Sequence, residues 1–336
     1  MKAGICGAAS RIERQFDNGI EPIIREVVRA ALDEAGLSIA DVDMVVTVAS
    51  DTLDGMMVPL RSELAGAVGK NYLNVSSAAG HAMSAAATAI EAGDADNVLV
   101  VGWGAASKLV AHDGRSNQFD PFYMRPIGAS PRVLAALQKQ MLVASGDIRE
   151  HDIEAFRARM THILWGSETI DSASRAYGFC DGAAALVLKR IAYGEPGAII
   201  ADHSMASRSH NPLDESIDPA IWVKEAIAGF SRKPSQAPAR GFIEASGSNT
   251  PAEMRAVAAL LDAGFIGCDA ASANGKGGGA MAWFGPATSL RALAELCGEL
   301  LAKGPARKSD AGIFVDLAGP LGQHVTTMFL ERRSPA

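Results

Sequence analysis

The segment that most restricts the fold of this chain is Asn74–Gly102, with the sequence NVSSAAGHAMSAAATAIEAGDADNVLVVG. A short loop enters a helix (Ala78–Ala92) built almost wholly from alanine, serine and glycine, and an apolar strand (Asn97–Gly102) follows it. Because such a helix has no large side chains, neighbouring backbones can approach it closely on every side. We therefore expect the helix to be packed between two layers of secondary structure.

Short apolar runs alternate with helical patterns along the first half of the chain. Ala3–Gly7 and Asp43–Ala49 predict strands. Pro22–Gly36 predicts an amphipathic helix, because proline stands at its start and glycine past its end. This alternation favours a mainly parallel sheet that is covered by helices.

The alternation breaks between about residues 105 and 174, which we interpret as an insertion lying over the sheet. A strand at Gly182–Lys189 restores it, and the second half of the chain repeats the plan of the first. Strands are expected at Gly197–Asp202, Gly241–Ala245, Gly312–Leu317 and His324–Glu331, and helices at Asp218–Phe230, Ala252–Ala263 and Pro286–Lys303. The order of elements therefore predicts a duplicated α/β protein with halves at 1–194 and 195–336, divided at the turn Gly194–Gly197.

The composition argues against several classes of protein. Of the 336 residues, 48% are hydrophobic and 21% are charged, which is typical of a soluble globular enzyme. The net charge of −7 is dispersed and no basic run is present, which argues against nucleic acid as a partner. The four cysteines lie far apart, so neither a disulfide nor a metal site is expected. Without a signal-peptide core or a membrane-length apolar run, we expect a cytoplasmic protein with no membrane span.

Several further motifs occur in a characteristic order. The turn Ser77–Gly80 opens the alanine-rich helix, and Cys180–Leu188 has the sequence CDGAAALVL. Three other stretches are GLSIADVDMVV, NGKGGGAMAWFGPATSLRALAEL and GPLGQHVTTMFLE. Across nearly the whole chain these motifs resemble the thiolase superfamily, and most closely its sterol-carrier or lipid-transfer-protein-like branch. The resemblance implies a duplicated, five-layered αβαβα fold with an inserted loop and helical region, and it places Ser77 at the position of the family's nucleophilic cysteine.

The other catalytic positions depart from the family pattern. Ser246, in EASGSNT, stands where the family has a histidine. A second family histidine, in a G-H-P-x-G turn, is absent at Ala282–Pro286, and no cysteine occurs near Leu317–Gly319, where the family has its acid/base cysteine. The resemblance therefore does not support ordinary Claisen thiolysis through a cysteine acyl-enzyme.

Ser77 is nevertheless a candidate nucleophile. A serine hydroxyl is a far weaker nucleophile than a thiolate, so a base must take its proton. His81 lies one helical turn further on and is the candidate base. In the alternative interpretation, Ser77 caps the helix by accepting N–H groups of the first turn, and His81 is a hydrogen-bonded polar residue inside a packed helix.

Other polar residues complete the candidate site. Ser246 and Asn249 are candidates to hydrogen-bond a thioester oxygen, with turn chemistry as the alternative. His324 follows the closing turn, which the resemblance places at the floor of the site, and a strand points half of its residues inward. The predicted catalytic residues are Ser77, His81, Ser246 and His324. The predicted oxyanion or substrate-binding residues are Asn249, Asn274, Gly319 and Gly322.

Coenzyme A contacts are predicted for Arg125 and Arg132, which lie in the insertion that covers the acyl-CoA tunnel in the family. The alternative is that both are ordinary exposed arginines. The glycine run Asn274–Gly279 lacks the spacing of a phosphate-binding loop, and close backbone approach in the core accounts for it better. We expect no tightly bound cofactor and no metal site, and a coenzyme A thioester as the substrate.

Two classes of function remain open. The first is an enzyme that makes or breaks a carbon–carbon bond in an acyl thioester, either by acyl transfer through Ser77 or by non-covalent retro-aldol cleavage. The second is a non-catalytic thiolase-fold subunit that shapes or supports an active partner. The resemblance implies a homodimer, and it makes a zinc-ribbon/OB-fold protein or an active thiolase homologue a reasonable partner.

Overall fold

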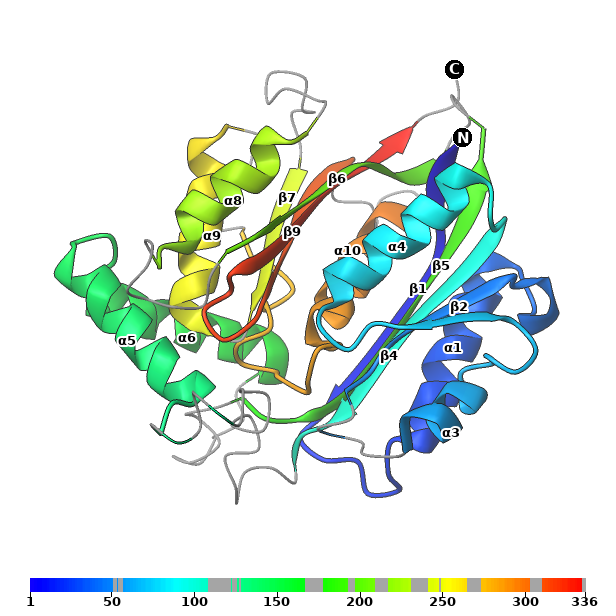
Figure 1. Cartoon of the computed structure of the whole chain (residues 1–336), viewed down its shortest axis with the longest axis horizontal. Coiled ribbons are helices and arrows are strands. Elements are labelled where there is room, and N and C mark those ends of the chain that lie inside the picture. Colours follow the sequence, from blue (N-terminus) through cyan, green and yellow to red (C-terminus); the bar gives the residue numbers. More distant parts are fainter. Residues whose placement is uncertain are drawn as a thin grey trace.

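The computed structural model describes residues 1–50, 53, 57–107, 122, 126, 128–166, 178–192, 197–208, 217–230, 241–247, 249–264, 273–302 and 310–333. Within these residues, nine strands form one mixed sheet with the order β3-β2-β4-β5-β1-β6-β9-β8-β7 (Figure 1). None of the helices that it describes has the length and hydrophobicity needed to cross a bilayer.

The predicted strands and helices are present, with differences at their ends, and β3, η1 and α3 form where no element was predicted. The strands are β1 (Lys2–Glu13), β2 (Met44–Val48), β3 (Asn71–Asn74), β4 (Asn97–Ala105), β5 (Asp181–Ile191), β6 (Gly197–Ser207), β7 (Gly241–Gly247), β8 (Ala311–Ala318) and β9 (His324–Arg333). The helices are α1 (Glu21–Ala35), the short 3-10 turn η1 (Ile39–Asp41), α3 (Met57–Leu64), α4 (Ala79–Ala92), α5 (Pro131–Ala144), α6 (Glu150–Trp165), α8 (Pro219–Ala228), α9 (Thr250–Asp262) and α10 (Thr288–Leu301).

The sheet is mixed, whereas a mainly parallel sheet was predicted. β2 runs parallel to β3 and β4, and β7 runs parallel to β8. The other five pairings are antiparallel. β5 lies between β4 and β1 and runs against both, and a short turn joins β8 to β9, which is a connection that only antiparallel neighbours can use.

Three large hydrophobic clusters define the layers. In the first, α1 and α3 pack on one face of β2, β4 and β5, against residues such as Val45 and Leu99. In the second, α4 and α10 pack on the opposite face of these strands and also on β8 and β9, through Phe314 and Met328. In the third, α8 and α9 cover the far face of β7, β8 and β9. The two ends of the one sheet thus lie on either side of α4 and α10 and count as two layers. The order is helix, sheet, helix, sheet, helix, so the predicted five-layered αβαβα fold is confirmed (Figure 1).

Helix α4 occupies the middle layer, as its composition predicts. Its small residues Ala79, Ala82, Ala86 and Ala87 have no exposed surface. The helix contacts strands of both halves of the sheet, including β1, β4, β8 and β9. The small side chains at these four positions therefore let two sheet layers and α10 approach one helix.

Two glycines on neighbouring strands make room for the turn that precedes α10. Gly104 of β4 lies directly opposite Gly182 of β5. A Cβ atom on Gly104 would lie 1.6 Å from the carbonyl oxygen of Phe284, and one on Gly182 would lie 2.7 Å from the Phe284 ring. The backbone before α10 thus rests directly on the sheet, which fixes the N-terminus of α10 in the same layer as α4.

The described residues include part of the predicted insertion at 105–174. Its helices α5 and α6 both contact α9 at one side of the molecule (Figure 1). Residues 194–196 of the predicted boundary turn lie outside the described residues. Strands up to Ile191 form one end of the sheet and strands from Gly197 form the other. The division of the chain into two halves stays a prediction.

Candidate active site

The first turn of α4 carries the two main catalytic candidates. β3 ends at Asn74, and the chain passes through Ser77 to Ala78, which is the N-cap position of the helix. Ser77 Oγ lies 3.0 Å from His81 Nδ1, which is hydrogen-bond distance. Because Ser77 is exposed and His81 is half-buried, the pair is accessible from the surface of the chain.

Ser77 does not cap α4. The cap position is Ala78, and the helix has no side-chain cap of its own. Three other helices are capped by side chains at their own N-cap positions: Ser130 for α5, Asp218 for α8 and Asn249 for α9. The helix-cap interpretation of Ser77 is therefore wrong, and its hydroxyl bonds to His81 instead.

A carboxylate from a distant strand meets the start of α4. Gly80 N–H donates to Asp316 Oδ2 at 2.6 Å, and Ser289 Oγ donates to Asp316 Oδ1 at 2.6 Å. Asp316 is 2% exposed. Burial raises its pKa, whereas the bonds from Ser289 and Gly80 and the nearby His81 lower it. Strand β8 and helices α4 and α10 thus converge on one carboxylate.

Asp316 is the centre of a polar row across three strands. Ser246 of β7 and Thr326 of β9 are its register partners on either side. Both are buried, and neither Ser246 Oγ nor Thr326 Oγ1 has a hydrogen-bond partner in the described structure. A Cβ atom on Gly80 would lie 2.6 Å from Thr326 Cβ, so the row lies directly against the first turn of α4.

The candidate residue His324 lies on the same face of β9 as this row. It precedes Thr326 by two residues, and side chains two apart on a strand share a face. Its Nδ1 is 3.1 Å from Ser207 Oγ on β6, and the residue is half-buried. The register therefore puts His324 on the inward face, and its part in catalysis stays a prediction.

The two candidate asparagines hold the backbone. Asn249 caps α9, because its amide oxygen accepts from Ala252 N–H at 2.8 Å. Asn274 is fully buried, and its amide pairs with both the N–H and the C=O of Ala245, at 2.7 and 2.9 Å. The capping contact accounts for Asn249, as the turn-chemistry alternative expected. The amide of Asn274 pairs with the edge of β7 inside the core, and its predicted contact with substrate stays a prediction.

Gly319 and Gly322 belong to the tight turn between β8 and β9. Their φ angles are 85° and 75°, a region that glycine adopts without strain, and Gly322 N–H donates to the carbonyl of Gly319. The turn accounts for both glycines, and it sets the register that brings Asp316 opposite Thr326. Their predicted contact with substrate stays a prediction.

The two arginines predicted to bind coenzyme A differ in what the structure shows. Arg125 lies outside the described residues. Arg132 is an exposed residue near the start of α5, a helix that packs against α9 (Figure 1). Contact with coenzyme A phosphates stays a prediction for both.

Comparison with known proteins identifies the fold. No family model matches the sequence, and no curated protein matches it. An Ltp2–ChsH2(DUF35) aldolase is similar, with a TM-score of 0.71 and 16% identity over 99% of this chain and 98% of that chain. The Acat5 thiolase from Ascaris suum in complex with coenzyme A has a TM-score of 0.69 and 14% identity, over 99% and 100%. This chain has the thiolase fold. An acetyl-CoA acetyltransferase from Syntrophomonas wolfei is also similar, with a TM-score of 0.65 and 16% identity, over 99% of each chain.

Within this thiolase fold, a buried glutamate that the sequence analysis missed holds the glycine-rich turn. Glu253 of α9 has no exposed surface. Its Oε1 accepts the N–H groups of Gly247, Gly279 and Ala280, at 2.9, 2.6 and 3.0 Å. Burial raises the pKa of Glu253 to about 8, against the opposing effect of these donors. The glycines thus allow close backbone approach, as their spacing predicts.

A second buried glutamate holds the same turn from the other side. Glu244 of β7 accepts from Lys276 N–H at 3.0 Å and from Gly278 N–H at 2.8 Å. Burial raises the pKa of Glu244 to about 7. Glu244 and Asp316 had a signal in the sequence, because each is a charged residue within an apolar strand, as in GFIEA and GIFVDLA.

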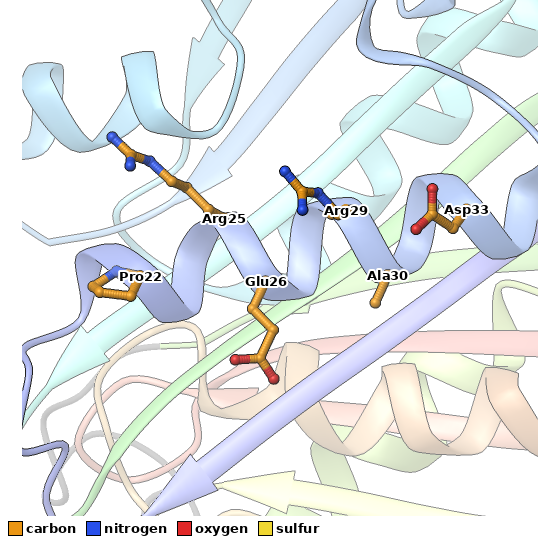
Figure 2. A pocket seen from close by; sticks show the side chains of 6 residues that line it. All are labelled: Pro22, Arg25, Glu26, Arg29, Ala30 and Asp33. Carbon is orange, nitrogen blue, oxygen red and sulfur yellow. The ribbon is translucent and has the colours of Figure 1, made fainter.

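Two shallow depressions lie on the outer layer of the thiolase fold. The one in Figure 2 has a volume of about 390 Å³ and is lined by Pro22, Arg25, Glu26, Arg29, Ala30 and Asp33, all on α1 or at its start. A neighbouring one of about 520 Å³ shares Arg25, Arg29 and Asp33. Because α1 and α4 cover opposite faces of the same strands, neither depression belongs to the candidate site.

The described residues hold no group of three or more histidine, cysteine or acidic side chains that could bind a metal. Cys6, Cys180 and Cys297 carry free thiols, and burial raises the pKa of each, to about 11 for Cys6. A buried thiol with a raised pKa is a poor nucleophile. Cys268 lies outside the described residues, and among those that the structure describes Ser77 remains the candidate nucleophile.

Proposed function

We propose that this chain is an enzyme that acts on an acyl thioester such as an acyl-CoA, with Ser77 as the acyl acceptor and His81 as its base. The observation that carries the proposal is the 3.0 Å contact between Ser77 Oγ and His81 Nδ1. A nucleophile and a base within hydrogen-bond reach are the minimum that serine chemistry needs. The similarity to thiolase-fold structures, one of them with coenzyme A, supports a thioester as the substrate.

The contact defines the first step. Ser77 donates to His81 Nδ1 when the ring carries its proton on Nε2. Ser77 Oγ attacks the thioester carbonyl, its proton passes to His81, and the carbon–sulfur bond breaks as the thiol leaves with that proton. His81 then takes the α-proton of a second thioester, and the resulting α-carbon attacks the acyl ester on Ser77. The carbon–carbon bond forms, the ester carbon–oxygen bond breaks, and the proton on His81 returns to Ser77 Oγ.

Retro-aldol cleavage is the second candidate, in line with a place in the lipid-transfer-protein-like branch. The similarity to an aldolase favours it. Here Ser77 and His81 accept the proton of a β-hydroxyl group, the carbon–carbon bond breaks, and N–H donors at the start of α4 hold the thioester enolate. No bond to Ser77 forms, so the two candidates differ in whether the enzyme is ever acylated.

Acylation is therefore the test. We expect acetyl-CoA to leave an acetyl group on the Ser77 peptide, visible by intact mass and peptide mapping, and Ser77→Ala to show none. Ser76→Ala, which removes the neighbouring exposed hydroxyl, is the matched control and should acylate normally. Cleavage of a β-hydroxyacyl thioester without an adduct would select the aldolase candidate. If neither an adduct nor cleavage is found, the interpretation as a non-catalytic subunit is the one that remains.

We further propose that the chain forms a homodimer through the edge strand β3. β3 is the last strand of the sheet in the described structure, and Tyr72 and Leu73 are 43% and 37% exposed. An exposed edge strand with apolar side chains is a surface for pairing with another chain. Because β3 ends three residues before Ser77, a second copy would also enclose the site. A zinc-ribbon/OB-fold protein is proposed as a further partner, by analogy with the Ltp2–ChsH2(DUF35) aldolase.

Leu73→Arg is expected to weaken the dimer. A charge on the exposed edge opposes strand pairing, so sedimentation should detect monomer at concentrations where the wild type is dimeric. Ile221→Arg, which changes a 44% exposed residue on α8, is the control and should remain dimeric. A wild-type protein that sediments as a monomer, or a dimer unaffected by Leu73→Arg, would contradict pairing through β3.

A further inference from the structure

The proposed function assigns no role to Asp316. We propose that Asp316 is a positioning residue, which caps α4 from β8 and so leaves the Ser77 hydroxyl to His81. The structural part of this inference stands on contacts alone, and its catalytic consequence rests on the proposed function.

Asp316 is identified as the cap by the backbone N–H from which it accepts a hydrogen bond. A side-chain cap normally accepts the N–H of the second or third residue of the helix. α4 begins at Ala79, so Gly80 is its second residue, and its N–H donates to Asp316 Oδ2 at 2.6 Å. Ala78, at the cap position, supplies no side-chain acceptor. Asp316, 236 residues further along the chain, therefore fills the role that a serine or aspartate beside the helix usually fills.

The neighbouring residues fit this contact closely. A Cβ atom on Gly80 would lie 3.0 Å from Asp316 Cβ and 2.6 Å from Thr326 Cβ, so only glycine lets the strands approach this near. Ser289 Oγ donates to the other carboxylate oxygen at 2.6 Å, which fixes the plane of the carboxylate. Asp316 is thus held from α10 while it binds α4.

The charge of Asp316 suits this place. A carboxylate at the N-terminus of a helix is stabilised by the helix dipole, and His81 is the third residue of the same helix. Two titratable groups lie on the packed strands at this turn, Asp316 on β8 and His324 on β9, and the side chain from α10 is the neutral Ser289.

The expected consequence of losing the cap is a change of partner for Ser77. Without Asp316, the Gly80 N–H is a buried donor with no acceptor, which is unfavourable. The buried hydroxyl of Thr326, which has no partner in the described structure, also lies against this turn, but we expect the donor to be taken by Ser77, which lies just before the cap position. Its hydroxyl then turns away from His81, and the nucleophile loses its base.

Two substitutions separate the cap from the charge. Asp316→Ala removes the acceptor, and we expect it to slow acetylation by acetyl-CoA at least about 100-fold, mainly in the maximal rate, as a misplaced reacting group does. Asp316→Asn keeps an oxygen acceptor for Gly80, and we expect it to recover the rate to within about tenfold of wild type, with a pH profile altered by the lost charge. Ser130→Ala, which removes the cap of α5, is the matched control and should acetylate normally.

The crystal structure of Asp316→Ala gives a readout that does not depend on activity. We expect Ser77 Oγ within hydrogen-bond distance of a first-turn N–H of α4 and no longer on His81. If Ser77 Oγ stays on His81, or if Asp316→Asn is as slow as Asp316→Ala, the inference is overturned. If the wild type is not acetylated, the proposed function falls, and the position of Ser77 in the variant still decides the inference. Should Asp316→Ala be insoluble, Asp316→Ser, whose shorter side chain withdraws the acceptor, replaces it in the same comparison.

Discussion

Replacing Gly104 by alanine is expected to destabilise the protein severely. The added Cβ atom would lie 1.6 Å from the carbonyl oxygen and 2.8 Å from the carbonyl carbon of Phe284. These are backbone atoms, so no side-chain rotation relieves the overlap. We expect a loss of at least about 3 kcal/mol in unfolding free energy, at the upper end of overpacking effects. Thermal unfolding followed by circular dichroism should show a Tm lower by about 6 °C or more, or the variant should be insoluble.

The site should be affected together with the fold. Phe284 precedes α10, and Ser289 of α10 donates to Asp316. If the turn moves away from β4 to admit the methyl group, the start of α10 moves with it. Soluble Gly104→Ala protein should therefore also acetylate Ser77 more slowly.

Gly298→Ala is the matched control for this substitution. Gly298 lies inside α10, and a Cβ atom there meets nothing within 4 Å. Alanine favours a helix over glycine by roughly 0.5–1 kcal/mol, so this variant should be slightly more stable than wild type. A Gly104→Ala protein with a wild-type Tm would show that the turn before α10 does not rest on β4 as described.

The layered fold could be predicted because its strongest constraint is local. A helix rich in alanine can pack closely between two sheet layers, and the structure buries Ala79, Ala82, Ala86 and Ala87 there. Only the face that carries His81 and Thr88 is partly exposed. Strand direction could not be predicted in the same way. Alternating strand and helix patterns suggested parallel neighbours, but pairing depends on where a strand enters the sheet, and β5 enters antiparallel between β4 and β1.

The candidate site was predictable where its contacts are local. Ser77 and His81 are only four residues apart, so their 3.0 Å contact could be expected from the sequence although Ser77 precedes the helix. Asp316 is 236 residues from Gly80, and no spacing rule connects them. The sequence showed only that a charged residue interrupts an apolar strand. Which helix that residue caps depends on the tertiary packing of β8 against α4.

The two buried glutamates, Glu244 and Glu253, lead to a second prediction, which concerns how the stability of the protein depends on pH. Burial raises the pKa of Glu253 to about 8 and that of Glu244 to about 7, from an ordinary glutamate pKa of 4.5. Between pH 4.5 and the raised pKa of each group, the folded state binds more protons than the unfolded state. The free energy of unfolding therefore falls as pH rises through this range. Each group adds a slope of up to about 1.4 kcal/mol per pH unit. We therefore expect the Tm of the wild type to be clearly higher at pH 5.5 than at pH 8.5.

Glu253→Gln should remove much of this dependence. The amide keeps an oxygen for the N–H groups of Gly247, Gly279 and Ala280, and it cannot ionise. At pH 5.5 the wild-type side chain is itself neutral, so the two proteins should have similar stability. At pH 8.5 the wild type must hold a buried charge whose Oε2 has no hydrogen-bond partner in the described structure, and the variant should be more stable by several kcal/mol.

Thermal unfolding of both proteins at pH 5.5, 7.0 and 8.5 tests this expected difference in the pH dependence of stability. Glu150→Gln is the control. Glu150 is exposed, and its contact with Lys139 lowers the pKa of the Glu150 carboxyl. A lowered pKa gives stability that is lost only as pH falls, so this variant should keep the wild-type slope between pH 5.5 and 8.5. If Glu253→Gln is as much below the wild type at pH 8.5 as at pH 5.5, Glu253 is ionised throughout this range, and its three N–H donors outweigh its burial.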